Sequence, residues 1–182
     1  MASDINPLYL QTLAALREDR PYLETSYCDV TDLASFPRTE NGYDTVICIN
    51  VIEHVRDDRA ALANIKSVLW NGGRTIVLVP QGQWNFGTLD DALGHQRRYS
   101  KEAIRSLAHE CGFEVSDIID FNRLGSLAWF INGRVLRRRN VGRGQIVLLN
   151  LLTPLMRILD RLLPVPSLSL IAVMKRTEPE SP

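Results

Sequence analysis

Two continuous apolar runs, residues 46–49 and 75–79, constrain most strongly what this chain can fold into. A strand with one face in water alternates apolar and polar side chains, whereas a strand buried on both faces is an almost unbroken apolar run. Residues 58–70 lie between the two runs and carry leucine and isoleucine at helical spacing, after the N-cap candidates Asp57 and Asp58. The order of buried strand, helix and buried strand predicts a parallel sheet.

The remaining sequence patterns extend this alternation. The run Asn71-Gly72-Gly73 is expected to end the helix at 58–70. Residues 81–99 form a long polar connection, and residues 123–166 contain two apolar, arginine-rich helical stretches. Further helices are predicted at 7–18 and 100–111, and further strands at 24–30, 113–121 and 168–173. The chain is therefore predicted to be α/β with a mostly parallel sheet, and its ligands should bind beyond the carboxyl ends of the strands.

Length and composition fit one compact domain, with 182 residues of which 45% are apolar and 23% are charged. Acidic and basic residues number 21 each, which argues against binding to nucleic acid through overall charge. The charge is unevenly distributed, however, because residues 123–161 contain eight arginines and only one acidic residue, Asp160. We predict a single domain with a core at 1–122, an arginine-rich helical lobe at 123–166, a last strand at 167–175 and a tail at 176–182.

The cysteine pattern bears on metal sites and on location. Cys28, Cys48 and Cys111 lie far apart and form no Cys-X-X-Cys pair, which argues against a disulfide framework and a zinc site. The sequence indicates no metal ligands. No secretory signal opens the chain, and no apolar stretch reaches the roughly 18 residues that a membrane-spanning helix needs. We therefore predict a cytoplasmic protein with free thiols.

Two motifs in a fixed order resemble class I S-adenosylmethionine-dependent methyltransferases. The family's strand-four motif corresponds to Tyr43-Asp44-Thr45-Val46-Ile47-Cys48-Ile49-Asn50-Val51-Ile52-Glu53-His54-Val55, followed by Asp57-Asp58. Its strand-five motif corresponds to Leu69-Trp70-Asn71-Gly72-Gly73-Arg74-Thr75-Ile76-Val77-Leu78-Val79-Pro80. The helix at 100–113 ends in the family's usual Gly-Phe, and residues 93–100 and 123–175 resemble a subset often encoded beside or fused to glycosyltransferases. The resemblance covers most of residues 1–122.

The resemblance implies S-adenosylmethionine as the cofactor and assigns residues to it. Asp4 matches the acid that accepts hydrogen bonds from the ribose hydroxyls, and a carboxylate is an acceptor-only partner for two O–H groups. Asp29, with the backbone of Val30, matches the position that recognises the adenine. Asn50 and Val51 match the main chain beside the methionyl end. Residues 1–122 are therefore expected to form the cofactor-binding core.

The same resemblance assigns residues to the acceptor of the methyl group. Glu53 and His54 are expected under the transferable methyl or beside the acceptor, and His95 lies in the long connection beyond strand five. Both histidines are candidate catalytic residues, because methyl transfer needs alignment of two substrates and removal of a proton. A structural role for each histidine and a solvated loop for the arginines are the alternatives. The predicted acceptor contacts are Glu53, Arg97, Arg98 and Tyr99.

One departure from the family is large. The family's glycine-rich loop follows strand one and precedes the strand-two acid by roughly 20 residues, whereas Asp4 is the fourth residue here. The predicted fold is thus a Rossmann-like methyltransferase sheet that lacks its first strand and glycine-rich loop, as in an N-terminally truncated chain. The open position in the sheet predicts pairing with another chain, and the missing glycine-rich loop predicts weak binding of the cofactor.

Two classes of function follow. The first is S-adenosylmethionine-dependent methyl transfer, at oxygen, to a small, sugar or lipid-linked acceptor, with peripheral membrane contact through the leucines and arginines of 123–166. The second is an inactive remnant or a binding module that keeps the fold. A dehydrogenase is disfavoured because no Gly-X-Gly-X-X-Gly motif occurs.

Overall fold

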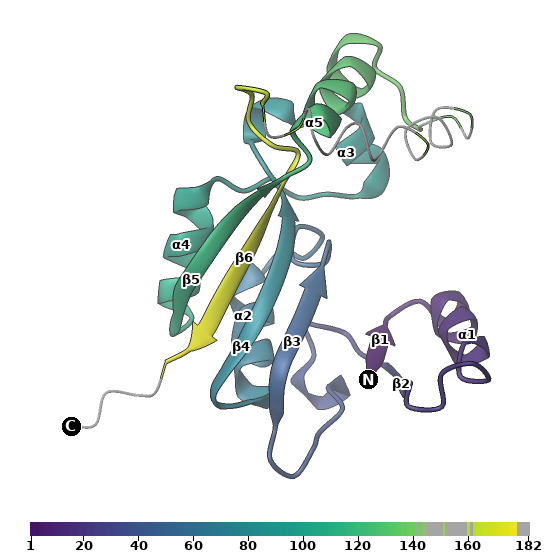
Figure 1. The fold of residues 1–182 in the computed structure, drawn as a ribbon, viewed down its shortest axis with the longest axis vertical. Coiled ribbons are helices and arrows are strands. Elements are labelled where there is room, and N and C mark those ends of the chain that lie inside the picture. Colours follow the sequence, from purple (N-terminus) through teal and green to yellow (C-terminus); the bar gives the residue numbers. More distant parts are fainter. Residues whose placement is uncertain (141, 143, 145–150, 152–159, 161, 178–182) are drawn as a thin grey trace.

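The fold was analysed in a computed structural model that describes residues 1–140, 142, 144, 151, 160 and 162–177. Its centre is a four-stranded sheet in the order β3-β4-β6-β5 (Figure 1). Strands β3 and β4 are parallel, and β6 is antiparallel to both of its neighbours. The strands are β3 (Tyr43–Ile49), β4 (Leu69–Pro80), β5 (Phe113–Phe121) and β6 (Ser169–Arg176). The predicted α/β fold is confirmed, with β6 as the one reversed strand.

The reversal of β6 follows from where the lobe begins and ends. The lobe leaves the sheet at the carboxyl end of β5, and Leu168 returns to the same end, where its N–H donates to the carbonyl of Asn122 at 3.0 Å. A strand that starts at this end must run back along the sheet. The predicted helical stretches at 123–166 are described in part, as α5 (Arg123–Phe130) and a π-helical turn, η3 (Ile131–Val135). The rest of these stretches lies largely outside the described residues.

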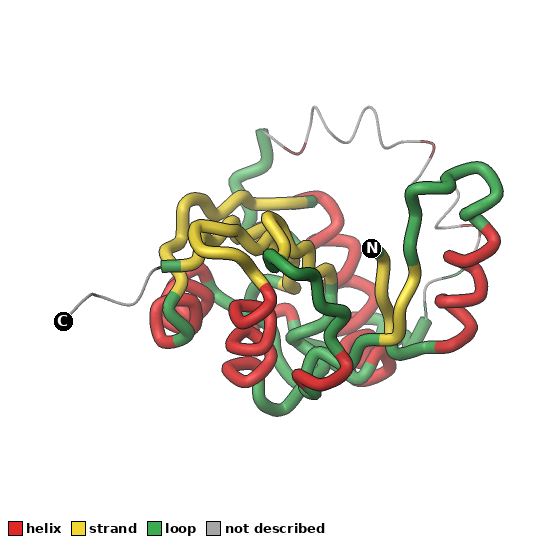
Figure 2. Tube along the Cα trace, turned by 90° about the horizontal axis from the view of Figure 1, so that it is seen from below, coloured by secondary structure: helices red, strands yellow, loops and turns green. Residues whose placement is uncertain are grey.

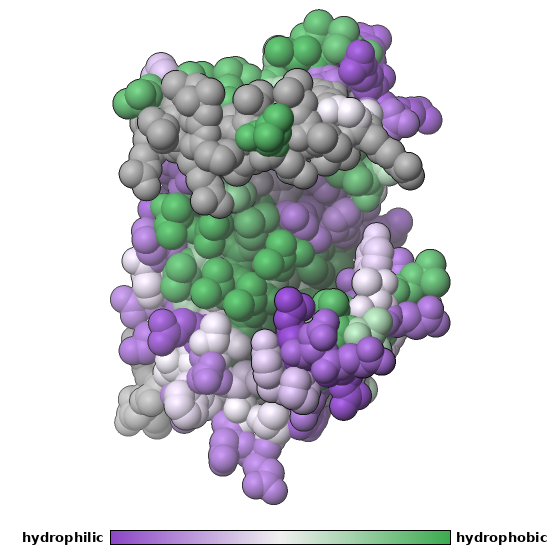
Figure 3. Space-filling model, turned by 45° about the vertical axis from the view of Figure 1, so that its right-hand side comes forward, coloured by the Kyte–Doolittle hydropathy of each residue, from purple (hydrophilic) through white to green (hydrophobic). Residues whose placement is uncertain are grey.

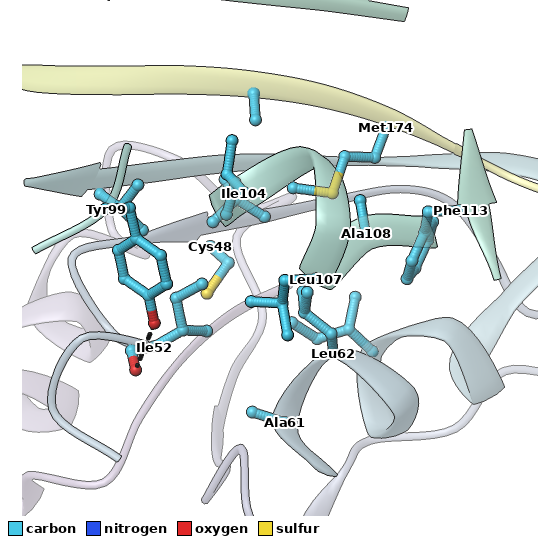
Figure 4. Close-up of a cluster of buried hydrophobic side chains, with 14 of the residues drawn as sticks. Cys48, Ile52, Ala61, Leu62, Tyr99, Ile104, Leu107, Ala108, Phe113 and Met174 are labelled. Carbon is cyan, nitrogen blue, oxygen red and sulfur yellow. Dashed lines mark hydrogen bonds between the residues drawn. The ribbon is translucent and has the colours of Figure 1, made fainter. Parts of the chain in front are cut away.

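Two helices cover one face of the sheet, as Figure 2 shows. These are α2 (Asp58–Val68) and α4 (Lys101–Glu110). Asp57 caps α2 by accepting from the N–H of Ala60 at 2.9 Å, and Ser100 caps α4 by accepting from that of Ala103 at 3.1 Å. The apolar stripes of both helices pack on the inward side chains of the strands (Figure 4). Each large apolar side chain that is fully buried there stabilises the fold by roughly 1.5–3 kcal/mol.

The opposite face of the sheet remains open to solvent in the described part of the chain. Ile47 and Ile49 of β3 are 62% and 58% exposed, whereas Cys48 between them is buried. Ile119 and Phe121 of β5 are also exposed, and apolar side chains gather on this side of the molecule (Figure 3). The prediction that the run 46–49 is buried on both faces was therefore wrong, because the helices α2 and α4 cover only the other face of the sheet.

A small unit precedes the sheet. It contains β1 (Ala2–Asp4), α1 (Pro7–Ala15) and β2 (Thr25–Tyr27), and β1 and β2 pair in parallel, with Ala2 opposite Thr25. In Figure 1 this unit lies beside β3, but within the described residues β1 and β3 belong to separate sheets. A short 3-10 turn, η1 (Leu33–Ser35), follows β2.

Two predicted boundaries differ from the structure. Residues 71–73 do not end α2, because the helix stops at Val68 and β4 already begins at Leu69, opposite Tyr43. The pairing then jumps to Thr45 opposite Arg74, so the glycines are accommodated in an irregularity of β4. The connection at 81–99 is also more ordered than predicted, since it contains η2 (Gln83–Asn85) and α3 (Thr88–Leu93).

Candidate active site

A cavity of about 320 Å³ lies at the carboxyl ends of β3 and β4. Its walls come from the segments after both strands, from the connection at 81–99, from α5 and from the start of β6. The lining includes Asn50, His54, Pro80, His95, Arg98 and Trp129. A wider depression of about 610 Å³ lies along the outer surface of α2 and contains no predicted site residue. The cavity at the strand ends is therefore the candidate site.

Asp90, on α3, organises the wall of this cavity. The side chain is fully buried, and one carboxylate oxygen accepts from Nδ1 of His95 and from Nε of Arg98, both at 2.8 Å. The other oxygen accepts from Nε1 of Trp129 and from the N–H of Gly87, both at 3.0 Å. Burial opposes ionisation, but the hydrogen bonds from His95, Trp129 and Arg98 hold the pKa of Asp90 at about 2. Asp90 is therefore a carboxylate that joins the connection to the lobe.

The local sequence explains how these groups converge. Gly94 ends α3 in the left-handed conformation, with φ at 77°, which glycine adopts without strain. The chain then folds back, so that the N–H of His95 donates to the carbonyl of Asp90 at 3.0 Å and the imidazole lies against the Asp90 carboxylate. Gly87 lies so close to the lobe that an added Cβ would be 2.9 Å from the carbonyl oxygen of Gly133.

Arg98 is held by contacts on several sides. Its side chain is 1% exposed, pairs with Asp90 and donates from Nη1 to the carbonyl of Gln81 at 3.1 Å. The guanidinium carbon lies 5.3 Å from the centre of the Trp129 ring, which is a cation–π distance. Arg98 therefore contributes a fixed positive charge to the wall of the cavity.

Glu53 and His54 form the turn after β3. Glu53 is fully buried, and neither of its carboxylate oxygens has a hydrogen-bond partner among the described residues. Burial raises the pKa of Glu53 to about 7. The exposed His54 ring packs edge to face on that of His95, with ring centres 4.8 Å apart. Partial burial, and then the neighbouring His95, lowers the pKa of His54.

The predicted cofactor residues all lie at or just after the carboxyl ends of strands. Asn50 follows β3 with φ at 50°, a left-handed conformation that asparagine tolerates, and it lines the cavity. The carbonyl of Val51 accepts from the N–H of His54 at 3.0 Å. Val30 follows Asp29 after β2, and its carbonyl accepts from the side chain of Asn64 at 3.0 Å.

The two acids have acceptor oxygens left for a ribose or an adenine. Asp4 uses Oδ1 to accept from the N–H of Asn6 at 2.7 Å, and Asp29 uses Oδ1 to accept from the N–H and hydroxyl of Thr31. The Thr31 hydrogen bonds lower the pKa of Asp29. Within the described residues, neither Oδ2 has a hydrogen-bond partner, so these residues fit the hydroxyl and amino donors of the cofactor.

Two predicted acceptor contacts point elsewhere. Arg97 pairs with Asp58 at 2.7 Å, and Tyr99 donates its hydroxyl to the same carboxylate at 2.8 Å. Neither residue lines the cavity. Both join the connection at 81–99 to the start of α2.

The sequence analysis missed Asp90 and Trp129. Asp90 is an ordinary first-turn acid of α3, and Trp129 is one of many apolar residues in the lobe. The spacing of Asp90 before His95 and Arg98 was the one local signal available, because residues five and eight positions apart can meet across a tight turn.

The fold and the cavity place this protein in the class I S-adenosylmethionine-dependent methyltransferase-like α/β proteins. A sequence family described as a methyltransferase domain matches residues 9–118, which is more than half of the chain. The chain therefore belongs to the methyltransferase domain family.

Individual relatives are distant or partial. The uncharacterized protein MJ0638 of Methanocaldococcus jannaschii is 34% identical over 79 residues, which are 43% of this chain and 34% of that protein. The match thus spans about a third of the length of this relative.

Solved structures share the fold at low identity. Magnesium protoporphyrin IX methyltransferase from Synechocystis, solved with bound S-adenosylhomocysteine, is 14% identical with a TM-score of 0.55, over 96% of this chain and 63% of that one. The (4+2)-cyclase SpnF is 14% identical with a TM-score of 0.62, over 97% of this chain and 66% of that one. Among the described residues, no helix has the length and apolar character needed to cross a membrane.

Proposed function

We propose that this protein transfers the methyl group of S-adenosylmethionine to an oxygen of a small, sugar or lipid-linked acceptor. The observation that carries the proposal is the imidazole of His95, which is oriented by the buried carboxylate of Asp90 and lines a cavity at the carboxyl ends of the strands. Ligands of open α/β sheets bind at this edge.

His95 is the proposed base. Asp90 is ionised and can only accept, so Nδ1 of His95 carries the proton that it donates. In the neutral imidazole with this tautomer, Nε2 is the nitrogen that can take the proton of an acceptor hydroxyl. The cofactor, when bound, supplies the methyl group. The chain aligns the acceptor and removes its proton.

Other residues would hold the two substrates. Asp4 and Asp29 offer free carboxylate oxygens to the ribose and the adenine, and Asn50 with Val51 lies at the end of β3, where the methionyl end is expected. His54, Arg98 and the Trp129 ring would contact the acceptor from the cavity wall. Acceptor contacts by Glu53, Arg97 and Tyr99 stay predictions.

A second candidate function is a binding module without catalysis. Among the described residues, Gly82 is the one glycine with a positive φ that directly follows the carboxyl end of a strand. The indole of Trp84 packs against it. No described glycine turn is therefore free to approach a cofactor closely. The likeness to a cyclase also illustrates that this fold hosts chemistry other than methyl transfer.

The test is transfer of isotope-labelled methyl from S-adenosylmethionine to separate panels of phenols, free sugars and polyprenyl-linked sugars in vesicles. We expect label in one panel, and a fall of turnover by roughly 10²–10⁴ in His95→Ala. The matched control is His109→Ala, because His109 is exposed on α4. Absence of label above a protein-free control in every panel would favour the binding module.

The lipid-linked acceptor has its own test. The exposed arginines 137–139 and the leucines of the lobe predict sedimentation with anionic vesicles at low salt and release at high salt. Equal binding to neutral vesicles would exclude the electrostatic contact.

A further inference from the structure

Three potential metal ligands lie close together, and two of them, His54 and His95, line the cavity. Glu53, His54 and His95 each offer a ligand atom, and these atoms all lie within 4.8 Å of one another. Glu53 and His54 come from the turn after β3, and His95 comes from the connection after α3. The N–H of Gln96 donates to the carbonyl of Glu53 at 2.7 Å, which fixes the two segments side by side.

The Glu53 carboxyl group is buried beside the two histidines without a hydrogen-bond partner among the described residues. An unpaired buried carboxylate is costly, whereas buried carboxylates that coordinate a metal are common. The two histidines beside it are the groups that could share such an ion.

The hydrogen bonding of His95 is that of a typical metal-binding histidine. A metal-binding imidazole usually donates its second N–H to a carboxylate, which fixes the ring and leaves the other nitrogen for the metal. Asp90 forms this contact with Nδ1 of His95 at 2.8 Å and is itself held by Trp129 and Gly87. The exposed His54 ring can rotate toward the other two ligands.

The charges of the site suit a cation. Glu53 and Asp90 are both acids, and Arg98 is the buried base, so one net negative charge remains when both carboxylates are ionised. The guanidinium of Arg98 is directed to Asp90 and to the carbonyl of Gln81. It makes no hydrogen bond to Glu53, whose oxygens stay free for a metal.

We propose that Glu53, His54 and His95 bind one divalent transition-metal ion, with Zn²⁺ as the representative ion. Two imidazoles and one carboxylate are the ligand types of three-ligand zinc sites and of other first-row metals, whereas Mg²⁺ prefers oxygen alone. Ligand atoms of a tetrahedral zinc site lie roughly 3.4 Å apart, so closing from 4.8 Å needs a small rotation of the side chains. A three-ligand site of this kind would leave one coordination position for a water molecule or a substrate atom.

The proposal that the site binds a metal does not depend on methyl transfer. A role of the bound ion in holding an acceptor oxygen rests on the proposed function. In that use the ion would occupy Nε2 of His95 and would replace this nitrogen as the group that prepares the acceptor hydroxyl, by lowering the pKa of the hydroxyl and positioning it. The cysteine spacing of the sequence does not indicate this site, because its ligands are a glutamate and two histidines and His95 lies 42 positions after Glu53.

The experiment measures metal binding by the full chain after treatment with a chelator. Zn²⁺ is titrated by calorimetry, and Co²⁺ is followed by its visible ligand-field absorption. We expect one equivalent with micromolar or tighter affinity, a rise in melting temperature with Zn²⁺, and no comparable effect of Mg²⁺.

Variants decide whether the proposed ligands are responsible. We expect His54→Ala, His95→Ala and Glu53→Gln each to weaken Zn²⁺ binding at least tenfold, and Asp90→Asn to weaken it by roughly 10–100-fold. His109→Ala and Cys111→Ser, at the C-terminal end of α4 and outside the cavity lining, should bind like the wild type. Because His54 is exposed, His54→Ala is expected to fold like the wild type. Circular dichroism of each metal-free variant checks that it is folded.

Two results would overturn the proposal: no stoichiometric Zn²⁺ binding by the wild type, or wild-type binding by His54→Ala and Glu53→Gln when both are folded. Full methyl transfer by metal-free protein would refute only the role of the metal in transfer. Zn²⁺ binding without any transfer would refute the proposed function and leave the metal site intact.

Discussion

One carboxylate, Asp90, shows how a single residue can hold a site together. It accepts four hydrogen bonds and joins α3, the following loop and the lobe, although it is fully buried. A buried ion pair adds little stability by itself, but removal of one partner leaves the other charge buried and unpaired. Asp90 is therefore a positioning residue for His95 and Arg98.

We predict that Asp90→Asn lowers the free energy of unfolding by about 3–5 kcal/mol, because the Arg98 guanidinium loses its counter-charge. Urea unfolding followed by circular dichroism measures the change. Asp91→Asn is the matched control, since Asp91 is exposed on the same helix and should change stability by less than about 0.5 kcal/mol. Equal stability of the two variants would show that Asp90 does not compensate Arg98.

At the scale of elements, Asp120 of β5 connects the sheet to both ends of the lobe. Its carboxylate accepts from Lys101 at 2.8 Å, from Arg123 at 3.0 Å and from Ser167 at 3.1 Å. Partial burial opposes ionisation, but the hydrogen bonds and charges of Lys101, Ser167 and Arg123 lower the pKa of Asp120. The contact therefore stabilises the folded state only while Asp120 is ionised.

We predict that Asp120→Asn costs about 1 kcal/mol of stability at neutral pH, a small value because the pair is partly exposed. The folded pKa is lowered, so the stabilisation is complete above the unfolded pKa of about 3.9 and disappears as the pH falls through the folded value. In unfolding curves from pH 7 downward, the difference between wild type and variant should stay constant above the unfolded pKa and shrink progressively below it. The control is Asp117→Asn, an exposed position of β5, and a pH-independent difference would contradict the assignment.

The open edge of β3 is the second element-scale feature. Its outer edge has no paired strand in the described residues, and its face carries the exposed Ile47 and Ile49. An unpaired apolar edge strand is a template for pairing with another chain. The pairing expected from the sequence stays a prediction.

We predict that a second copy of the chain pairs along β3, so that the wild type self-associates as concentration rises. Ile47→Lys should reduce this association, because a lysine on an exposed strand disfavours edge pairing. Sedimentation velocity measures it, with Ile5→Lys as control at another exposed isoleucine. A wild type that stays monomeric at all concentrations would exclude the pairing.

At the scale of the molecule, the sheet and the N-terminal unit carry the predicted cofactor residues, but the described part of the chain places no free glycine turn beside them. Asp4 and Asp29 have carboxylate oxygens available, whereas Gly72 and Gly73 lie at the amino end of β4, away from the cavity. Close approach of a backbone to the cofactor normally needs glycine.

We predict that the 182-residue chain binds S-adenosylmethionine more weakly than micromolar. Isothermal titration calorimetry of the purified chain measures the dissociation constant. Asp29→Ala should weaken the remaining binding by about 1–3 kcal/mol if the Asp29 carboxylate contacts the adenine. Micromolar or tighter binding by the wild type would show that other groups replace the glycine turn.

Periodicity in the sequence by itself determined the α/β class, the order of helices and strands, and the polar residues at the strand ends. These features depend on neighbours within a few positions, such as the apolar stripe of α2 and the cap at Asp57. The family motif that follows β3 is also local in sequence, and two of its residues, Asn50 and His54, line the cavity. The sequence order could not show whether a long apolar run such as 46–49 is covered on both faces.

Only the tertiary structure decided which distant residues meet. Asp90 binds Trp129 across 39 positions, and Glu53 meets His95 across 42, through the packing of the lobe and the connection on the strand ends. The exposure of Ile47 was likewise decided by which helices cover the sheet. The physical reason is that local patterns report whether a side chain prefers burial, whereas its partners depend on how the separate elements pack together.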